Sequence, residues 1–281
     1  MKHYKAIFFD WDGTAVLSRK APVEDAVNAM RPLLDKGVKL CIVSGTTYEN
    51  IAGGKLHSYF TPKQLENLYL GLGRGAFDYG YDAAGEPTIL VNRVPDAKGI
   101  LAVHDACYRI HRELLEKHGM NTDIVFSRPN YCKIDLMPAN NRGENLFLQE
   151  GEAARLQHIL QQHGIDSIET VIAMAESFGT PEMPLRATTD AKYLEVGPTG
   201  KSDNVDALFA RFGFTAEDCC FWGDEFIGVT DSIFGSDAGM LTEKTKNGDF
   251  YDVSDLEGVR PEQVKHLGGG TQTFLEFLQA Q

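Results

Sequence analysis

Short apolar runs that end in small or acidic residues alternate with helical patterns at the start of the chain. The run YKAIFFD ends at Asp10, and the run VKLCIVSGT ends among small polar residues around Ser44. Between them, apolar residues recur at helical spacing over 22–36, where Pro32 is expected to kink or restart the helix because it lacks an amide. A third run, ENLYLGLG, follows. This order of elements predicts a parallel sheet with right-handed crossovers.

The middle of the chain follows a different pattern. Apolar positions over 97–118 have the spacing of one amphipathic helix. The runs TDIVFS and YCKIDLM are expected to form strands, with a hairpin across RPN. Residues 151–163 are expected to be helical, whereas IETVIAMA and AKYLEVG are expected to be strands. These elements predict an inserted α+β domain.

The first pattern returns after residue 196. Helical spacing over 203–212 precedes CCFWGDE, a further apolar run that ends in acids. We therefore predict an α/β fold with a Rossmann-like parallel sheet. Its core domain comprises residues 1–93 and 197–281, and the inserted α+β domain comprises residues 94–196.

Composition narrows the range of partners. The 281 residues carry a formal net charge of −13, which argues against duplex nucleic acid because its binders need a basic surface. No apolar run approaches the ~18 residues of a membrane span, and the first residues lack the pattern of a signal peptide. Five cysteines without metal-like spacing indicate a reduced protein. We expect a cytoplasmic protein that binds neither nucleic acid nor membranes.

Two acids directly follow the first apolar run, in the sequence DWDGT. Asp10 has the position of a nucleophile, and Asp12 has the position of a general acid and base. Carboxylates this close repel each other unless a cation lies between them, and Mg²⁺ prefers oxygen ligands. An ordinary turn at a strand end, where Asp and Gly favour the geometry, is the alternative.

A second acidic cluster follows the run CCFW. Asp224 is placed to complete a metal site at the end of this strand. Glu225 and Asp231, the latter seven residues beyond Asp224, are candidates to bind the metal through water or to steady the loop. Acids of this kind are also common in turns without a metal.

A lysine after a glycine turn indicates a phosphate site. The stretch VGPTGKS contains the second half of a nucleotide-binding loop, but the position of that loop's first glycine is occupied by Glu195. Lys201 is therefore expected to neutralise a phosphoryl group rather than to hold ATP. The Ser44 hydroxyl and the backbone amides from Gly45 onward are expected to hold phosphoryl oxygens. A solvated lysine and a loop serine are the ordinary alternatives.

The order of acids, hydroxyl, lysine and acids resembles the haloacid dehalogenase (HAD) superfamily. FFDWDGT is similar to its first motif, Ser44 to its second, Lys201 to its third and WGDEFIGVTD to its fourth. The resemblance covers residues 5–245 and points to the Cof-like and phosphomannomutase-like subgroup, which carries an α+β cap. LGLGRGAFDYGYDAAGEPTIL resembles the hairpin that leads into this cap. The loop from Asp224 to Asp231 is longer than in the commoner fourth motif and is similar to that of phosphomannomutases.

This resemblance implies a Mg²⁺-dependent phosphatase for small phosphomonoesters such as sugar phosphates. Asp10 would form an aspartyl-phosphate, and Asp12 would protonate the leaving oxygen and then activate water. Mg²⁺ would be held by Asp10, the Asp12 carbonyl and Asp224. The cap would select the small phosphorylated metabolite, with Arg128 and Arg142 as candidate ligands, in a monomer or a homodimer.

Three other interpretations stay open. Transfer of the phosphoryl group to a sugar hydroxyl would make the protein a phosphosugar mutase, which the longer fourth motif favours. The sequence GLGRGA, Gly71 to Ala76, matches a dinucleotide-binding pattern, but the residues after it indicate a hairpin instead of a helix. A phosphosugar-binding protein without activity would be expected to lack a catalytic residue, whereas each core position here holds a competent one.

Overall fold

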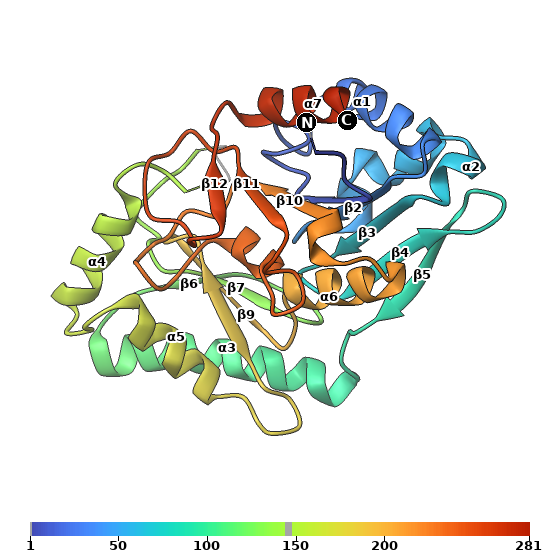
Figure 1. Cartoon of the computed structure of the whole chain (residues 1–281). Coiled ribbons are helices and arrows are strands. Elements are labelled where there is room, and N and C mark those ends of the chain that lie inside the picture. Colours follow the sequence, from blue (N-terminus) through green and yellow to red (C-terminus); the bar gives the residue numbers. More distant parts are fainter. Residues whose placement is uncertain (1, 144–147) are drawn as a thin grey trace.

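The computed structural model describes residues 2–143 and 148–281 (Figure 1). Its larger sheet has eight strands, whose order is β12 (Val264–His266), β11 (Asp249–Asp252), β10 (Cys219–Gly223), β1 (Ala6–Phe9), β2 (Lys39–Val43), β3 (Leu68–Leu72), β4 (Phe77–Tyr81) and β5 (Pro87–Asn92). Neighbouring strands from β12 to β3 are parallel, whereas β4 and β5 are added antiparallel. The predicted parallel sheet is confirmed, and so is the hairpin after β3.

Helices cover both faces of this sheet. On one face lie α1 (Glu24–Asp35), α2 (Pro62–Leu65) and α7 (Gly270–Ala280), and on the other lies α6 (Lys201–Phe212) (Figure 1). Successive residues of β1 alternate between the two faces, because Ile7 and Phe9 join one apolar cluster and Ala6 and Phe8 the other. Strand β1 is therefore buried on both faces, as expected of a central parallel strand.

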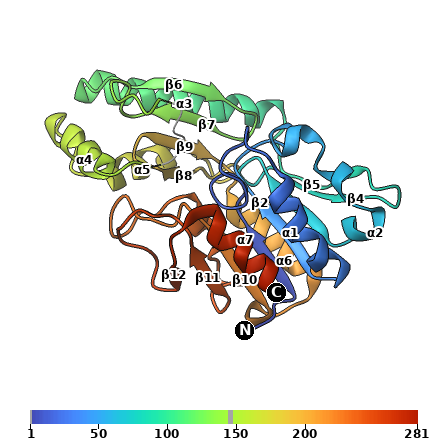
Figure 2. The same ribbon diagram turned by 90° about the horizontal axis from the view of Figure 1, so that it is seen from above.

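A second sheet lies beside the first. Its four strands, in spatial order, are β6 (Asp123–Ser127), β7 (Cys132–Asp135), β9 (Tyr193–Gly197) and β8 (Arg186–Thr189), all antiparallel. It packs with α3 (Ala97–His118), α4 (Glu152–Gln162) and α5 (Ile168–Ser177) around a separate apolar cluster. Figure 2 shows these elements together on one side of the molecule. We call residues 97–197 the cap region and the rest the core region.

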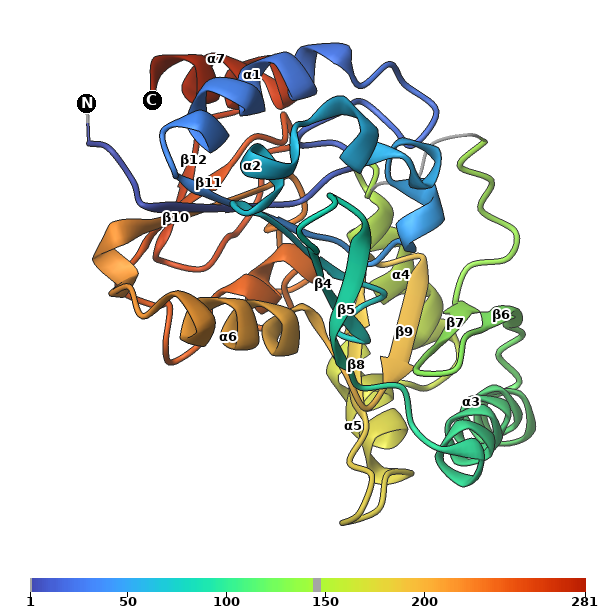
Figure 3. The same ribbon diagram turned by 90° about the vertical axis from the view of Figure 1, so that its right-hand side faces the viewer.

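The chain crosses between the two regions twice, once from β5 to α3 and once from β9 to α6 (Figure 3). The crossings lie close to the predicted domain boundaries, after residue 93 and after residue 196. That residues 94–196 form a separate domain stays a prediction. Short 3-10 helices complete the core region: η1 (Tyr48–Asn50), η2 (Ala52–Gly54), η3 (Leu56–Tyr59), η4 (Ala216–Asp218) and η5 (Ser236–Met240).

Two expectations about single elements were wrong. The run IETVIAMA forms helix α5 instead of a strand. Its buried residues Ile168, Val171, Ile172 and Ala175 have helical spacing, and their burial outweighs the strand preference of β-branched residues. The restart expected at Pro32 is also absent, because helix α1 continues through this exposed residue. A kink at Pro32 stays a prediction.

No helix among the described residues combines the length and the apolar composition needed to cross a membrane.

The aromatic stack beneath β1 and β10 yields a stability prediction. Phe221 is fully buried, and its ring centre lies 4.9 Å from that of Phe8 and 4.5 Å from that of Phe250. We expect Phe221→Ala to lower the free energy of unfolding by about 3–5 kcal/mol, since it leaves a cavity in the core. Urea unfolding measures this change. The control Leu17→Ala alters an exposed side chain and should change little; equal effects of the two variants would contradict the predicted stack.

Candidate active site

Loops at the carboxyl ends of three adjacent strands meet in one cavity of about 390 Å³. Strand β1 lies between β2 and β10, so Asp10, Ser44 and Asp224 follow neighbouring strands at the same edge of the sheet. Lys201 enters from the start of α6. The predicted residues that line the cavity are Asp10, Asp12, Ser44, Gly45, Arg128, Lys201 and Glu225. The structure thus gathers residues that lie more than 200 positions apart in the sequence.

The turn after β1 brings the first motif against the fourth. Gly13 has φ of +86°, a conformation that L side chains rarely adopt. A Cβ atom there would lie 2.1 Å from Oδ2 of Asp224, so only glycine permits this approach. Thr14 then donates a hydrogen bond of 2.9 Å to the other oxygen, Oδ1, of Asp224. The DGT part of the motif therefore fixes where Asp224 sits.

Asp10 and Asp12 each carry an oxygen without a partner. Both residues are buried, and Oδ1 of each has no hydrogen bond among the described residues. Burial raises the pKa of Asp10 to about 7 against the attraction of Lys201. Burial also raises the pKa of Asp12, and Arg19, 3.6 Å from its Oδ2, acts in the opposite sense. Oxygens of this kind are available to a reacting group.

Lys201 is held by two carboxylates. Its Nζ lies 2.6 Å from Oδ1 of Asp237 and 3.4 Å from Oδ2 of Asp10. These neighbours raise its pKa above the usual value although burial acts in the opposite direction, so the ammonium stays charged. The other oxygen of Asp237 accepts hydrogen bonds from the backbone amides of Asp224 and Glu225. Asp237 thus joins the lysine to the loop after β10.

Three carboxylates form a group that fits a divalent cation. Oxygens of Asp10, Asp224 and Asp237 all lie within 4.8 Å of one another. Burial, followed by the charges of Asp237, Glu225 and Asp10, raises the pKa of Asp224 well above its usual value. A set of oxygen ligands with excess negative charge is what a hard cation such as Mg²⁺ requires.

The two remaining acids of the fourth motif, Glu225 and Asp231, lie in different surroundings. Glu225 lines the cavity and accepts a 2.7 Å hydrogen bond from Ser236, and burial raises its pKa to about 7. Asp231 is exposed and does not line the cavity. The structure therefore does not bring Asp231 to the other site residues, and Asp237, which the sequence analysis did not single out, occupies the position beside the lysine.

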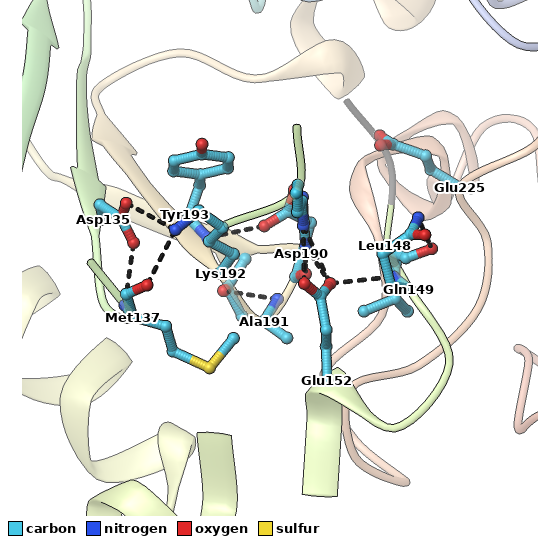
Figure 4. Close-up of polar contacts among 12 residues, drawn as sticks. Asp135, Met137, Leu148, Gln149, Glu152, Asp190, Ala191, Lys192, Tyr193 and Glu225 are labelled. Atoms are coloured by element: carbon cyan, nitrogen blue, oxygen red, sulfur yellow. Dashed lines mark hydrogen bonds and ion pairs between the residues drawn. The ribbon is translucent and has the colours of Figure 1, made fainter. Parts of the chain in front are cut away.

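The two cap arginines also differ. Arg128 lines the cavity, whereas Arg142 does not. The side chain of Arg142 is buried and forms ion pairs with Glu152 at 2.5 Å and with Asp190 at 2.7 Å. Figure 4 shows Glu152 and Asp190 close together, with Glu225 apart from them. The structure thus gives Arg142 partners within the cap region, and a direct contact with substrate stays a prediction for both arginines.

Sequence reasoning missed other residues of the cavity. Arg19 reaches Asp12 from the loop after the first motif, and Arg74 and Glu195 also line the cavity. The sequence GSD around Asp237 repeats the glycine-then-acid pattern of GDE and is a signal that could have marked it. Arg74 lies inside GLGRGA, whose glycines drew attention instead.

Solved structures share this fold, although no family model and no curated protein matches the sequence. An IMP-bound mutant of the IMP-nucleotidase of Plasmodium falciparum aligns with a TM-score of 0.62 at 14% identity, over 99% of this chain. The sucrose-phosphatase of Synechocystis, in complex with sucrose and phosphate, aligns with a TM-score of 0.58 at 12% identity, over 99% of this chain and 98% of its own. The chain has the haloacid dehalogenase fold.

The match extends differently over each protein. This chain spans 66% of the nucleotidase chain, so that protein contains substantial further sequence. A protein from Eubacterium rectale aligns at 16% identity with a TM-score of 0.51, over 99% of this chain and 98% of its own. At such identities the likeness establishes the HAD fold, which the motif order had predicted.

The ion pairs of Arg142 predict a structural role that can be measured. We expect Arg142→Met to lower the free energy of unfolding by about 3–5 kcal/mol, because it leaves Glu152 buried without its partner. Chemical denaturation at constant pH measures this. Arg112→Met removes an exposed pair with Glu116 and should have a far smaller effect. Equal effects would argue against a buried cluster.

The carboxylate group predicts binding of a divalent cation. Mg²⁺ should raise the melting temperature. At a concentration of roughly 100 times its Kd, it should raise the free energy of unfolding by about 2.7 kcal/mol. The raised pKa of Asp10, about 7, means that protons compete for the site, so the gain should be smaller at pH 6 than at pH 8.

Matched variants locate this cation. Asp224→Asn should abolish the Mg²⁺-dependent shift, whereas Asp231→Asn alters an exposed residue outside the cavity and should retain it. Differential scanning fluorimetry with and without EDTA measures both. Loss of the shift in Asp231→Asn would contradict this assignment.

Proposed function

We propose that the protein is a Mg²⁺-dependent phosphatase that hydrolyses small phosphomonoesters through an aspartyl-phosphate. The observation that carries this proposal is the pair of unpartnered oxygens, Oδ1 of Asp10 and Oδ1 of Asp12, in one cavity with Lys201. A buried carboxylate oxygen without a hydrogen bond is costly, and its presence supports a reacting role. The HAD fold adds support, since solved neighbours are a nucleotidase and a sucrose-phosphatase.

The first step uses both acids. Oδ1 of Asp10 attacks phosphorus, the bond from phosphorus to the ester oxygen breaks, and Asp12 gives its proton to that oxygen. The raised pKa of Asp12 favours the protonated form that this step needs. In the second step Asp12 takes a proton from water, the water oxygen bonds to phosphorus, and the bond to Asp10 breaks to release phosphate.

Charge stabilisation comes from several groups. Lys201, the Ser44 hydroxyl and the backbone after Gly45 hold the phosphoryl oxygens. Asp10 and Asp224, which belong to the acidic group of the site, would hold Mg²⁺ together with the Asp12 carbonyl, and the ion would supply positive charge to offset the anionic phosphoryl group. Asp237 keeps Lys201 directed at the site through the 2.6 Å contact.

A sugar phosphate is the proposed class of substrate. The cavity holds about 390 Å³ and is lined by hydroxyl and charged side chains more than by apolar ones, which suits a polyhydroxylated leaving group. The sucrose-phosphatase neighbour, solved with sucrose and phosphate, supports this choice. IMP, bound in the nucleotidase neighbour, defines the nucleotide class that the assay must include.

A phosphosugar mutase is the second candidate. The loop between Asp224 and Asp237 is long, and it includes the motif that resembles phosphomannomutases. In that case the phosphoryl group would pass from Asp10 to a sugar hydroxyl instead of water. Conversion of a hexose monophosphate with a bisphosphate activator, without net phosphate release, separates this activity from hydrolysis.

Five free cysteines, all buried, support the proposal of a cytoplasmic location.

Phosphate release by the purified protein with Mg²⁺ tests the proposed function. The substrates are p-nitrophenyl phosphate, hexose phosphates, sucrose 6-phosphate and IMP. We expect Asp10→Asn to reduce turnover at least about a thousandfold, since it removes the nucleophile, and EDTA to abolish it. Asp25→Asn, an exposed carboxylate on α1, is the matched control and should keep full activity. Turnover that survives in Asp10→Asn would rule out the aspartyl-phosphate route.

A further inference from the structure

The turn between β3 and β4 contains an arginine in a strained backbone conformation. Gly73, Arg74 and Gly75 have φ values of +67°, +54° and +91°. A left-handed conformation is unfavourable for arginine, so its side chain must gain enough in contacts to offset this strain. Gly75 also approaches the second crossing closely, because a Cβ atom there would lie 2.4 Å from the carbonyl oxygen of Gly200. This turn therefore touches the residue directly before Lys201.

The guanidinium of Arg74 crosses from the core region to the cap region. It is buried and donates hydrogen bonds to the carbonyl oxygens of Thr199 at 2.7 Å, Glu195 at 3.2 Å and Arg186 at 3.3 Å. A further bond of 3.3 Å reaches Oγ1 of Thr188. One core side chain thus binds β8, β9 and the crossing that follows β9.

Reciprocal bonds close this contact. Thr199 Oγ1 donates to the carbonyl oxygen of Arg74 at 2.8 Å. Asn130, from the β6–β7 hairpin of the cap region, donates to the carbonyl oxygen of Gly73 at 2.7 Å and to Thr199 Oγ1 at 3.0 Å. Asn130 is itself buried. Two of the cap's strand pairs are therefore attached to the same three-residue turn.

Arg74 also sets charges inside the cavity. Its Nε lies 3.5 Å from Oε2 of Glu195, whose other oxygen lies 3.1 Å from Nζ of Lys133. Burial alone would raise the pKa of Glu195, but Lys133 and Arg74 hold it below the usual value. All three side chains line the same cavity as Asp10 and Asp12. Glu195 therefore links Arg74 to Lys133.

We infer that Arg74 is a positioning residue that fixes the cap region on the core and, through Glu195, places Lys133 to select the leaving group. This inference rests on the proposed phosphatase function for its selectivity, and on the structure alone for its anchoring. It also assigns a purpose to GLGRGA, whose glycines permit the turn and whose arginine forms the contact.

Selectivity is the first measurement. Core residues are proposed to bind the phosphoryl group, so the rate with p-nitrophenyl phosphate depends mainly on them. The rate with a hexose phosphate also depends on the residues that contact the sugar. We expect Arg74→Met to lower the ratio of kcat/KM for the best hexose phosphate to that for p-nitrophenyl phosphate at least about tenfold. Arg74→Lys, which keeps the charge, should recover part of this loss. Glu195→Gln should lower the ratio as well.

Arg260→Met is the matched control. Arg260 is also buried, and its partners Asp252, Ser254, Leu256 and Gly258 lie outside the cap region and the cavity. Its loss removes a buried guanidinium whose hydrogen-bond partners all lie within residues 252–258, so the ratio should stay within about twofold of the wild-type value. If Arg74→Met does not fold, Arg74→Lys and Glu195→Gln carry the same comparison.

Hydrogen exchange tests the anchoring without any activity. Peptides that cover residues 193–200 should exchange faster in Arg74→Met than in the wild type, and Arg260→Met should leave them unchanged. Unchanged exchange in Arg74→Met overturns the anchoring. If the wild type is active and Arg74→Met leaves the ratio of kcat/KM values unchanged, the link from Arg74 to Lys133 is refuted. A wild type that cleaves no phosphomonoester refutes the proposed function, and the exchange result then decides on Arg74 by itself.

Discussion

The site depends on keeping several carboxylates close together with little water between them. Asp10, Asp12 and Asp237 are each at most 6% exposed, and charges at such short range repel strongly where the dielectric is low. Lys201 supplies the contact cation, since it reaches both Asp10 and Asp237. Backbone amides after β10 donate hydrogen bonds to Asp237, and the proposed Mg²⁺ would supply the remaining positive charge. Without these groups the carboxylates would take up protons and lose their chemistry.

This constraint explains why the fold places the site where it does. Parallel strands end at one edge, so residues from distant parts of the sequence converge there without a long loop. The turn at Gly13 permits the closest approach, between the first and fourth motifs. The cap region contributes further lining residues to the same cavity, among them Lys133 and Glu195.

Much of the core fold was predictable because its strands are continuous apolar runs and its helices have apolar residues at helical spacing. Strand β1 and helix α3 follow such patterns almost residue for residue. Helix α5 was wrongly expected to be a strand because its sequence is rich in β-branched residues, although its buried residues have helical spacing and pack against α3 and β8. Local propensity cannot report such a tertiary effect.

The residues of the candidate site also differ in how well the sequence predicted them. Asp10, Asp12, Ser44 and Lys201 lie at element boundaries, and a motif read in chain order is enough to bring them together. Asp237 and Arg74 depend on the path of a loop and of a turn, which no spacing rule describes. Arg142 illustrates the converse, because a cationic residue in the expected segment proved to be enclosed by acids of its own region.

The partners of Arg74 have a consequence for how such a protein can change over time. Three of its acceptors are main-chain carbonyl oxygens, which every amino acid offers equally. Substitution of side chains along β8 and β9 can therefore leave these hydrogen bonds between Arg74 and the main chain intact. Because the cap region is attached through main-chain atoms, substitutions of side chains in the cavity can change which substrate is bound. The contact between the two regions stays the same.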